Sequence, residues 1–196
     1  MSRAVMPLHG MGGLERATRD LVRHLAALEC DVTLVTPPAT VDAHATGDDP
    51  FASRRITIRH VSYITFPFAN RRGTTILDRN TAYLVWARRA GRRALALVQS
   101  GDVDIVHSQG AAAEGYARAR LRGKAPAPLV LNPHGLEEFG ATGPPLPPAR
   151  RLGYAPLRRA VRACARAADA VIATDRSLEA VVRRHLRVTD DRVQVI

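Results

Sequence analysis

Apolar residues recur along the chain at two different spacings, one typical of helices and one typical of strands. Between Gly12 and Glu29 they return every three or four positions, which predicts a helix whose buried face holds Leu14, Ala17, Leu21, Leu25 and Leu28. Short apolar runs such as 31–36 and 128–132 have the length and composition of buried strands. Helical stretches of ten or more residues separate most of these runs. The order predicts an α/β fold, with a Rossmann-like parallel sheet and helices on both of its faces.

The same pattern assigns the remaining elements. Strands are expected at 2–6, 31–36, 56–61, 103–107, 128–132, 169–173 and 192–196. Helices are expected at 12–29, 74–98, 111–121, 157–168 and 175–186, with Thr174 or Asp175 capping the last one. The apolar stripe of the helix at 157–168 is formed by Leu157, Val161, Cys164 and Ala168. The first strand is only a stub, because the start of the chain leaves it about half the usual length. Loops are expected at 41–53 and 66–73, and the proline-rich segment 143–148 is either a hinge or lid or a plain connector.

A glycine-rich stretch, His9 to Arg16, joins the first apolar segment to the first helix. Its glycines, Gly10, Gly12 and Gly13, permit positive φ and let a ligand approach main-chain N–H groups without a Cβ in the way. A helix that begins there directs its unbonded N–H groups and the positive end of its dipole toward that ligand. A phosphate group is therefore the natural ligand, and a tight turn with no ligand is the alternative.

Two common phosphate-binding motifs do not fit this stretch. A dinucleotide site needs a third glycine where Glu15 stands, and an acidic residue after the second strand, which instead ends in Thr36-Pro37-Pro38. A P-loop needs Gly-Lys followed by Ser or Thr, which is absent. The loop therefore favours a phosphate in another kind of ligand.

Two further polar features follow predicted strands, namely His107 and the pair His134-Gly135. Ligands of parallel sheets lie beyond the carboxyl ends of the strands. The glycine-rich loop and both histidines are therefore expected to meet at one edge of the sheet. Considered alone, His107 is equally well explained as a side chain that bonds a neighbouring loop, and His134 is better explained as a strand-end histidine in a turn with Gly135.

Composition limits the possible partners. The net charge of +11 comes almost entirely from arginine, since Lys124 is the only lysine. This reflects either a GC-rich genome or attraction to anionic lipid. Arg150, Arg151, Arg158, Arg159 and Arg162 are candidates for lipid contact, or else form the solvated side of a helix. Aromatic residues make up only 5% of the chain, which disfavours nucleic acid as a partner.

The sequence lacks several features that would direct a protein to a membrane or out of the cell. No apolar run approaches the roughly 20 residues of a membrane span, and no signal peptide precedes the first motif. Cys30 and Cys164 lie in no metal-binding spacing, so reduced thiols are expected. These features predict a cytoplasmic protein, with peripheral contact at the inner membrane face as an option.

Four segments, in this order along the chain, carry a family resemblance: Gly12-Gly13-Leu14-Glu15-Arg16, Asp104-Ile105-Val106-His107-Ser108-Gln109, Asn132-Pro133-His134-Gly135 and Ala168-Asp169-Ala170-Val171-Ile172-Ala173. They resemble the GG-x-E-R loop, the D-hydrophobic-V-H-x-H strand end, the His-Gly strand end and the A-D-x-V-I-A-x-S strand of family 4 glycosyltransferases. Those enzymes have the GT-B architecture of two Rossmann-like domains that face a cleft. The resemblance implies that residues 1–196 form the N-terminal, acceptor-side domain, one half of that architecture.

The resemblance also implies an activity. Such enzymes transfer a sugar from a nucleotide-sugar donor to a glycan or lipid-linked acceptor, with retention at the anomeric carbon and without a metal or other cofactor. It puts the donor diphosphate against Gly12 and Gly13, and His134 beside the reacting sugar as the catalytic residue. His107 and Gly135 are expected in the same site. Glu15 either lines the acceptor side or favours the first helical turn electrostatically.

The chain departs from the family pattern at several positions. Gln109 replaces the second histidine of H-x-H, and Glu29-Cys30 stands where Gly-His is common. The chain ends at Val195-Ile196, where the family continues with Pro-Asn-Gly and a donor-binding domain that carries E-x7-E. We therefore expect that domain to be absent and the chain alone to be inactive. The alternative is a non-catalytic or truncated binding module, peripheral at an anionic membrane surface.

Overall fold

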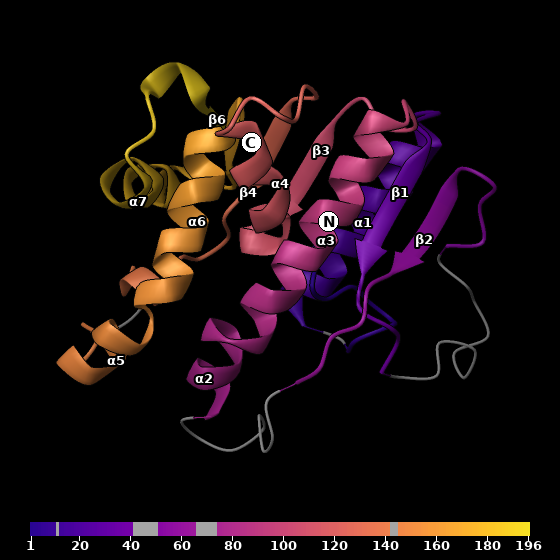
Figure 1. Cartoon of the computed structure of the whole chain (residues 1–196). Coiled ribbons are helices and arrows are strands. Elements are labelled where there is room, and N and C mark those ends of the chain that lie inside the picture. The colour runs from indigo at the N-terminus through magenta and orange to yellow at the C-terminus, as the bar shows by residue number, and fades with distance from the viewer. Residues whose placement is uncertain (11, 41–50, 66–73, 142–144) are drawn as a thin grey trace. The chain divides into compact units, whose positions relative to one another are not determined.

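The computed structural model describes residues 1–10, 12–40, 51–65, 74–141 and 145–196 (Figure 1). The chain divides into two compact units, Met1–Tyr63 and Ile64–Ile196. The predicted loop at 66–73, most of the loop at 41–53 and part of the proline-rich segment lie outside the described residues. No helix within the described ranges is long and apolar enough to cross a membrane.

The smaller unit combines one helix with two parallel strands. These elements are α1 (Gly13–Ala27), β1 (Val32–Thr36) and β2 (Ile56–His60). The strands run in register from Val32 opposite Ile56 to Thr36 opposite His60. The sequence pattern predicted all three to within two residues at each end.

The predicted first strand at 2–6 is wrong. Ser2 and Val5 are fully buried, and the Ser2 N–H donates to the Val35 carbonyl over 3.2 Å. The Ser2 hydroxyl, however, donates to the Ala4 carbonyl, and the chain turns at 6–9. A local side-chain bond of this kind competes with a strand ladder, so this segment packs beside β1 without joining its sheet.

The buried face of α1 also differs from the prediction. Thr18 and Val22 are buried, whereas Ala17 is exposed and Leu28 is 74% exposed. Thr18 can be buried because its hydroxyl donates to the Leu14 carbonyl over 2.9 Å. Val22 joins the core of this unit. That core is formed by Val5, Leu8, Val22, Leu34 and Phe51, with Val32, Ile56 and Ile58 packed against it.

The larger unit contains a four-stranded parallel sheet. Its strands are β3 (Val106–Gln109), β4 (Leu129–Asn132), β5 (Ala170–Ala173) and β6 (Val193–Val195), in that spatial order. Its helices are α2 (Thr74–Asn80), α3 (Ala82–Gln99), α4 (Glu114–Arg120), α5 (Pro148–Gly153), α6 (Ala155–Ala167) and α7 (Arg176–Leu186), and its short 3-10 turns are η2 (Gly110–Ala113), η3 (Glu137–Phe139) and η4 (Asp190–Arg192). Successive strands are joined through α4, α6 and α7, and α4 packs against both α3 and α6 (Figure 1). Parallel strands flanked by helices confirm the predicted Rossmann-like α/β class.

Two details of α6 and α7 were correctly predicted. Leu157, Val161 and Cys164 form the buried stripe of α6. Asp175 caps α7, since its carboxylate accepts a hydrogen bond from the Leu178 N–H over 2.7 Å.

The long helix predicted at 74–98 is broken at Thr81. The Asn80 side chain donates to the Ile76 carbonyl over 2.7 Å and accepts from the Leu157 N–H of α6 over 3.0 Å. The Thr81 backbone takes φ −121° and ψ −82°, which is not helical. These polar contacts end α2 where the apolar period alone would continue, because the period carries no information about a bond to α6.

β3 lies further along the chain than predicted. The pattern gave 103–107, but Ile105 is 60% exposed and the ladder with β4 pairs His107 with Val130 and Gln109 with Asn132. Pairing with β4 selects the polar residues 107–109, because ladder hydrogen bonds depend on the main chain and not on side-chain hydropathy. His107 therefore lies inside the strand, and Gln109 occupies its carboxyl end.

Glycines bring α3 and α4 into backbone contact. A Cβ at Gly91 would lie 2.3 Å from the Tyr116 nitrogen, and one at Gly115 would lie 2.3 Å from the Arg88 carbonyl oxygen. Neither main-chain atom can move away without shifting a helix. This contact places α4, and with it the turn after β3.

Candidate functional site

The glycine-rich loop ends in an open helix start. Gly12 is the N-cap of α1 and Gly13 its first residue. Because the N-cap is glycine, it offers no side-chain acceptor to the first N–H groups of the helix. A Cβ at Gly13 would meet no described atom within 4 Å. Main-chain N–H donors beside open space are what a phosphate requires. Met11, which precedes them in the loop, lies outside the described residues.

Glu15 lies against the same helix start. A Cβ at Gly12 would lie 2.3 Å from Oε2 of Glu15, so this carboxylate folds back over Gly12. A carboxylate in the first turn interacts favourably with the positive end of the helix dipole. An anion that binds beside Gly12 would have to displace it.

His9, at the start of the glycine-rich loop, and His60, at the end of β2, bond to the same main-chain carbonyl, which the sequence pattern did not predict. Nε2–H of His9 and Nδ1–H of His60 both donate to the Pro37 carbonyl just beyond β1, over 3.1 and 3.0 Å. Nδ1 of His9 accepts from the Val5 N–H over 3.3 Å. Burial lowers the pKa of His9, which favours the neutral ring that these contacts need. The only signal in the sequence is the position of His9, directly before Gly10.

A strained turn follows β4. His134 has φ 57° and Leu136 has φ 52°, so the left-handed residues lie on either side of Gly135 rather than on it. Non-glycine residues adopt this conformation infrequently, although Asn, Asp and His do so more often than others. The Asn132 side chain supports the turn, because its Oδ1 accepts from the His134 N–H over 3.3 Å. Backbone strain that is held in this way is typical of functional sites.

Gln109 orients the His134 ring. Nε2 of His134 and Oε1 of Gln109 are 2.5 Å apart, and since the amide oxygen only accepts, Nε2 carries the proton. Gln109 is 7% exposed and pairs with Asn132 in the ladder, so β3 and β4 together set this contact. No described residue hydrogen-bonds to Nδ1 of His134, which keeps its lone pair. Burial lowers the pKa of His134 to about 4, so the ring is neutral at pH 7.

His107 is not at the carboxyl end of its strand, as was predicted. It lies two residues before Gln109, and therefore on the same face of β3 but deeper in the sheet. Burial lowers the pKa of His107 to about 4, with a smaller contribution from His134. Both rings are therefore neutral at pH 7, and His134 is nearer the edge of the sheet.

The two glutamates after Gly135 have separate environments. Glu137 is exposed and pairs with Arg79 over 3.0 Å. Glu138 is only 8% exposed, and burial raises the pKa of its carboxyl. Of the two, only Glu137 is therefore exposed to solvent. Consecutive positions on a short 3-10 turn point in different directions, so composition alone could not separate them.

The structure thus assembles part of the predicted site. The pairing of β3 with β4 brings Gln109 to His134 and places His107 behind them. Gly12, Gly13 and Glu15 belong to the smaller unit, so their convergence with the histidines at one edge stays a prediction. Within the part of the chain that the structure describes, no group of three or more His, Cys, Asp or Glu side chains is arranged to hold a metal ion.

Comparison with known proteins bears on this arrangement. A family model described as Glycosyltransferase Family 4 matches residues 11–196. The matched region begins inside the glycine-rich loop and includes β3, β4 and the strained turn. No curated protein matches the chain.

Proposed function

We propose that this chain, which belongs to glycosyltransferase family 4, transfers a sugar from a nucleotide-sugar donor to an acceptor with retention at the anomeric carbon. The family match makes the chain a glycosyltransferase domain, one that acts on a sugar donor and an acceptor. In the proposal it supplies the acceptor-side half of the site and works with a second, donor-binding domain. The observation that carries the proposal is the neutral His134 ring, held by Gln109 in the His-Gly turn.

His134 is proposed to contact the donor sugar. With Nε2–H bonded to Gln109, the Nδ1 lone pair can accept a hydrogen bond from a sugar hydroxyl. Cleavage of the bond between the anomeric carbon and the donor diphosphate builds positive charge on the sugar ring, and an imidazolium beside it would oppose that charge. A ring with its pKa lowered to about 4 avoids this repulsion.

The start of α1 is proposed to bind the donor diphosphate. The uncapped N–H groups at Gly12 and Gly13, together with the helix dipole, favour the negative charge that builds on the leaving phosphate. Glu15 turns away when the diphosphate binds, since two anions would otherwise share the space beside Gly12. In this proposal the reaction uses no metal or other cofactor.

The remaining site residues have supporting roles in the proposal. Gly135 keeps the backbone between two left-handed residues narrow, so that a ligand can approach His134. His107, two residues before Gln109 on the same face of β3, is proposed to support Gln109 rather than touch the donor. A glycan or a lipid-linked molecule is the acceptor.

A donor screen tests the proposal. The chain is assayed for nucleoside diphosphate release from UDP-, GDP- and ADP-sugars, alone and together with a family 4 donor-binding domain. We expect release only in the second case, and a product whose anomeric configuration, assigned by NMR, equals that of the donor. An inverted product would refute retention. Absence of release with every donor, while an acceptor still binds, would instead favour the non-catalytic binding module.

A further inference from the structure

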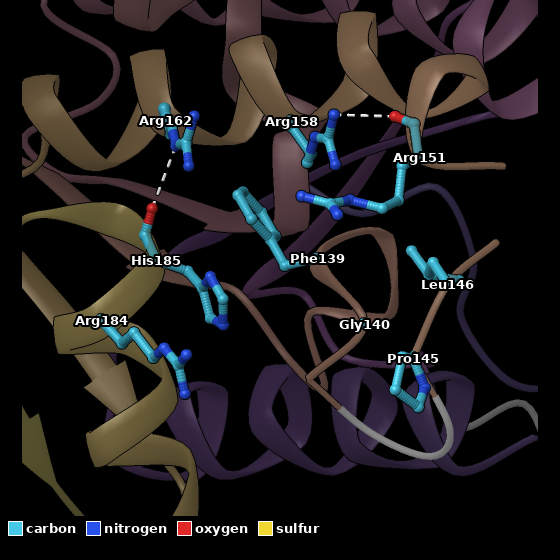
Figure 2. A pocket seen from close by; sticks show the side chains of 9 residues that line it. All are labelled: Phe139, Gly140, Pro145, Leu146, Arg151, Arg158, Arg162, Arg184 and His185. Atoms are coloured by element: carbon cyan, nitrogen blue, oxygen red, sulfur yellow. Dashed lines mark hydrogen bonds between the residues drawn. The ribbon is translucent and has the colours of Figure 1, made fainter. Parts of the chain in front are cut away.

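Four arginine side chains from three helices face one pocket of about 570 Å³ (Figure 2). Arg151 comes from α5, Arg158 and Arg162 from α6, and Arg184 from α7. The other lining residues are Phe139, Gly140, Pro145, Leu146 and His185. All of them belong to the larger unit. The sequence pattern places Arg151, Arg158 and Arg162 on a lipid-facing or solvated helix side and gives no indication of Arg184.

Carboxylates on α7, just after it and on η3 pair with arginines that do not line the pocket. On α7 and just after it, Glu179 and Asp190 both pair with Arg183, the neighbour of Arg184. Glu137 pairs with Arg79. Among the described residues, none of the four pocket arginines forms an ion pair. The pocket therefore gathers four guanidinium groups that have no ion-pair partner among the described residues.

Glu138 is the carboxyl group that acts on the charge of a pocket residue, namely Arg158. It is buried, and burial raises the pKa of its carboxyl, while Arg158 and Arg79 act in the opposite direction. Its oxygens form no ion pair with a pocket arginine among the described residues. One buried carboxyl cannot balance four guanidinium groups.

Main-chain contacts hold two of the guanidinium groups in place. Arg158 donates to the Arg151 carbonyl over 2.7 Å, and Arg162 donates to the His185 carbonyl over 3.0 Å. The Arg162 guanidinium also lies over the Phe139 ring, 5.1 Å from its centre. A guanidinium has five N–H donors, so these contacts leave most of them for a ligand. Burial and the neighbouring Arg162 and Arg151 lower the pKa of Arg158, as expected where like charges are held together.

We propose that this pocket binds a phosphorylated small molecule, whose phosphate oxygens contact the arginine side chains and whose organic part contacts Phe139, Pro145 and Leu146. Arginine forks match phosphate oxygens with paired, charge-assisted hydrogen bonds. A phosphate ester or diphosphate carries about two or more charges, whereas a carboxylate carries one. The volume lies within the range of pockets for small organic ligands, roughly 300–1,000 Å³, and exceeds what a bare anion needs.

This inference does not depend on the proposed transfer reaction, because it concerns a pocket formed by other residues. Two sources share the ligand chemistry. One is a soluble phosphorylated sugar or polyol, and the other is the headgroup of an anionic phospholipid. The experiment has one arm for each source.

The test compares two double variants of equal charge. Arg151→Ala with Arg184→Ala removes two exposed pocket arginines whose side chains make no hydrogen bond to another described residue. Arg159→Ala with Arg166→Ala removes two exposed arginines of α6 that do not line the pocket. Both variants lose two positive charges, so a general electrostatic effect would weaken them equally. Thermal melting checks that both remain folded.

Binding is measured by calorimetry at constant ionic strength, with inorganic pyrophosphate and with glucose 6-phosphate, and with sodium acetate as the carboxylate comparison. Sedimentation with phosphatidylcholine vesicles, with and without phosphatidic acid, forms the lipid arm. Since charge-assisted hydrogen bonds to the phosphate are lost with both guanidinium groups, we expect the pocket variant to bind at least about tenfold more weakly. The control variant should change by less than about twofold.

Each result of these measurements identifies one ligand class or rejects the proposal. Loss confined to the soluble probes identifies a soluble phosphate ester as the ligand class, and loss confined to the phosphatidic acid vesicles identifies a lipid headgroup. Equal loss in both variants would overturn the proposal, and so would wild-type binding of phosphate probes no tighter than that of acetate. A failed donor screen would leave all these results unaffected, so the two proposals fail independently.

Discussion

The glycine-rich loop before α1 and the strained turn after β4 were predicted as parts of one site, yet they are built in opposite ways. At the loop, Gly13 faces no described atom within 4 Å, and only the flexible end of Glu15 lies against Gly12. At the turn, Asn132 holds the His134 backbone and Gln109 holds its ring. The loop leaves main-chain donors open, whereas the turn keeps one side chain in one orientation.

The two motifs differ in whether their role can be recognised from the packing of the structure. Glycines in a phosphate-binding loop are needed for the space they leave, so their role is invisible in the packing of the free chain. A histidine with positive φ is held against its own backbone preference by neighbours, so its role leaves a trace in the structure. Substitutions should therefore affect binding at the loop and chemistry at the turn.

The largest effect is expected from His134→Ala. Removing the ring should lower sugar transfer by at least about 100-fold, the lower end of the range for a positioned histidine. Turnover is measured with a saturating donor in the presence of the donor-binding domain proposed above, and folding is checked by thermal melting. His134→Asn is the control for the backbone, because asparagine tolerates positive φ. It should fold as well as the wild type and be equally inactive, and near-normal turnover by either variant would remove His134 from the site.

A smaller effect is expected from Gln109→Leu, which removes the acceptor for Nε2–H but keeps a buried side chain of similar size. We expect kcat to fall about tenfold with little change in KM, since orientation of a group already present is lost. ¹⁵N NMR of the His134 ring should show a mixture of tautomers in place of the Nε2–H form. Gln109→Glu restores an acceptor and should restore that tautomer, while raising the pKa of His134. An unchanged tautomer in Gln109→Leu would contradict the positioning role.

The smallest effect is expected from Gly13→Ala. Open space beside Gly13 means that the free energy of unfolding should change by less than about 1 kcal/mol, while nucleoside diphosphate affinity falls several-fold. Gly91→Ala is the matched control, since its Cβ would meet the Tyr116 backbone at 2.3 Å and should destabilise the fold by about 1–3 kcal/mol. Chemical denaturation and calorimetry measure the two quantities. Equal destabilisation by both would mean that Gly13 is a packing residue.

Short-range patterns predicted most elements of the fold. The apolar period located α1, α6 and α7, and continuous apolar runs located β1, β4 and β5. They failed where a distant partner mattered. Asn80 ends α2 through a bond to α6, and pairing with β4 moves β3 onto polar residues. Such contacts join positions far apart in the chain, and no local period records them.

The candidate site divides in the same way. Gly12, Gly13 and the His-Gly pair could be recognised from their residue types, because glycine freedom and imidazole chemistry belong to the residues themselves. The bond from Gln109 to His134 required the register between β3 and β4, and the arginine pocket required three helices to pack around Phe139. Residue type limits what a side chain can do, but orientation, burial and the charges around it depend on packing. Packing buries His134 and so keeps its ring neutral, and packing of three helices brings four arginines to one pocket.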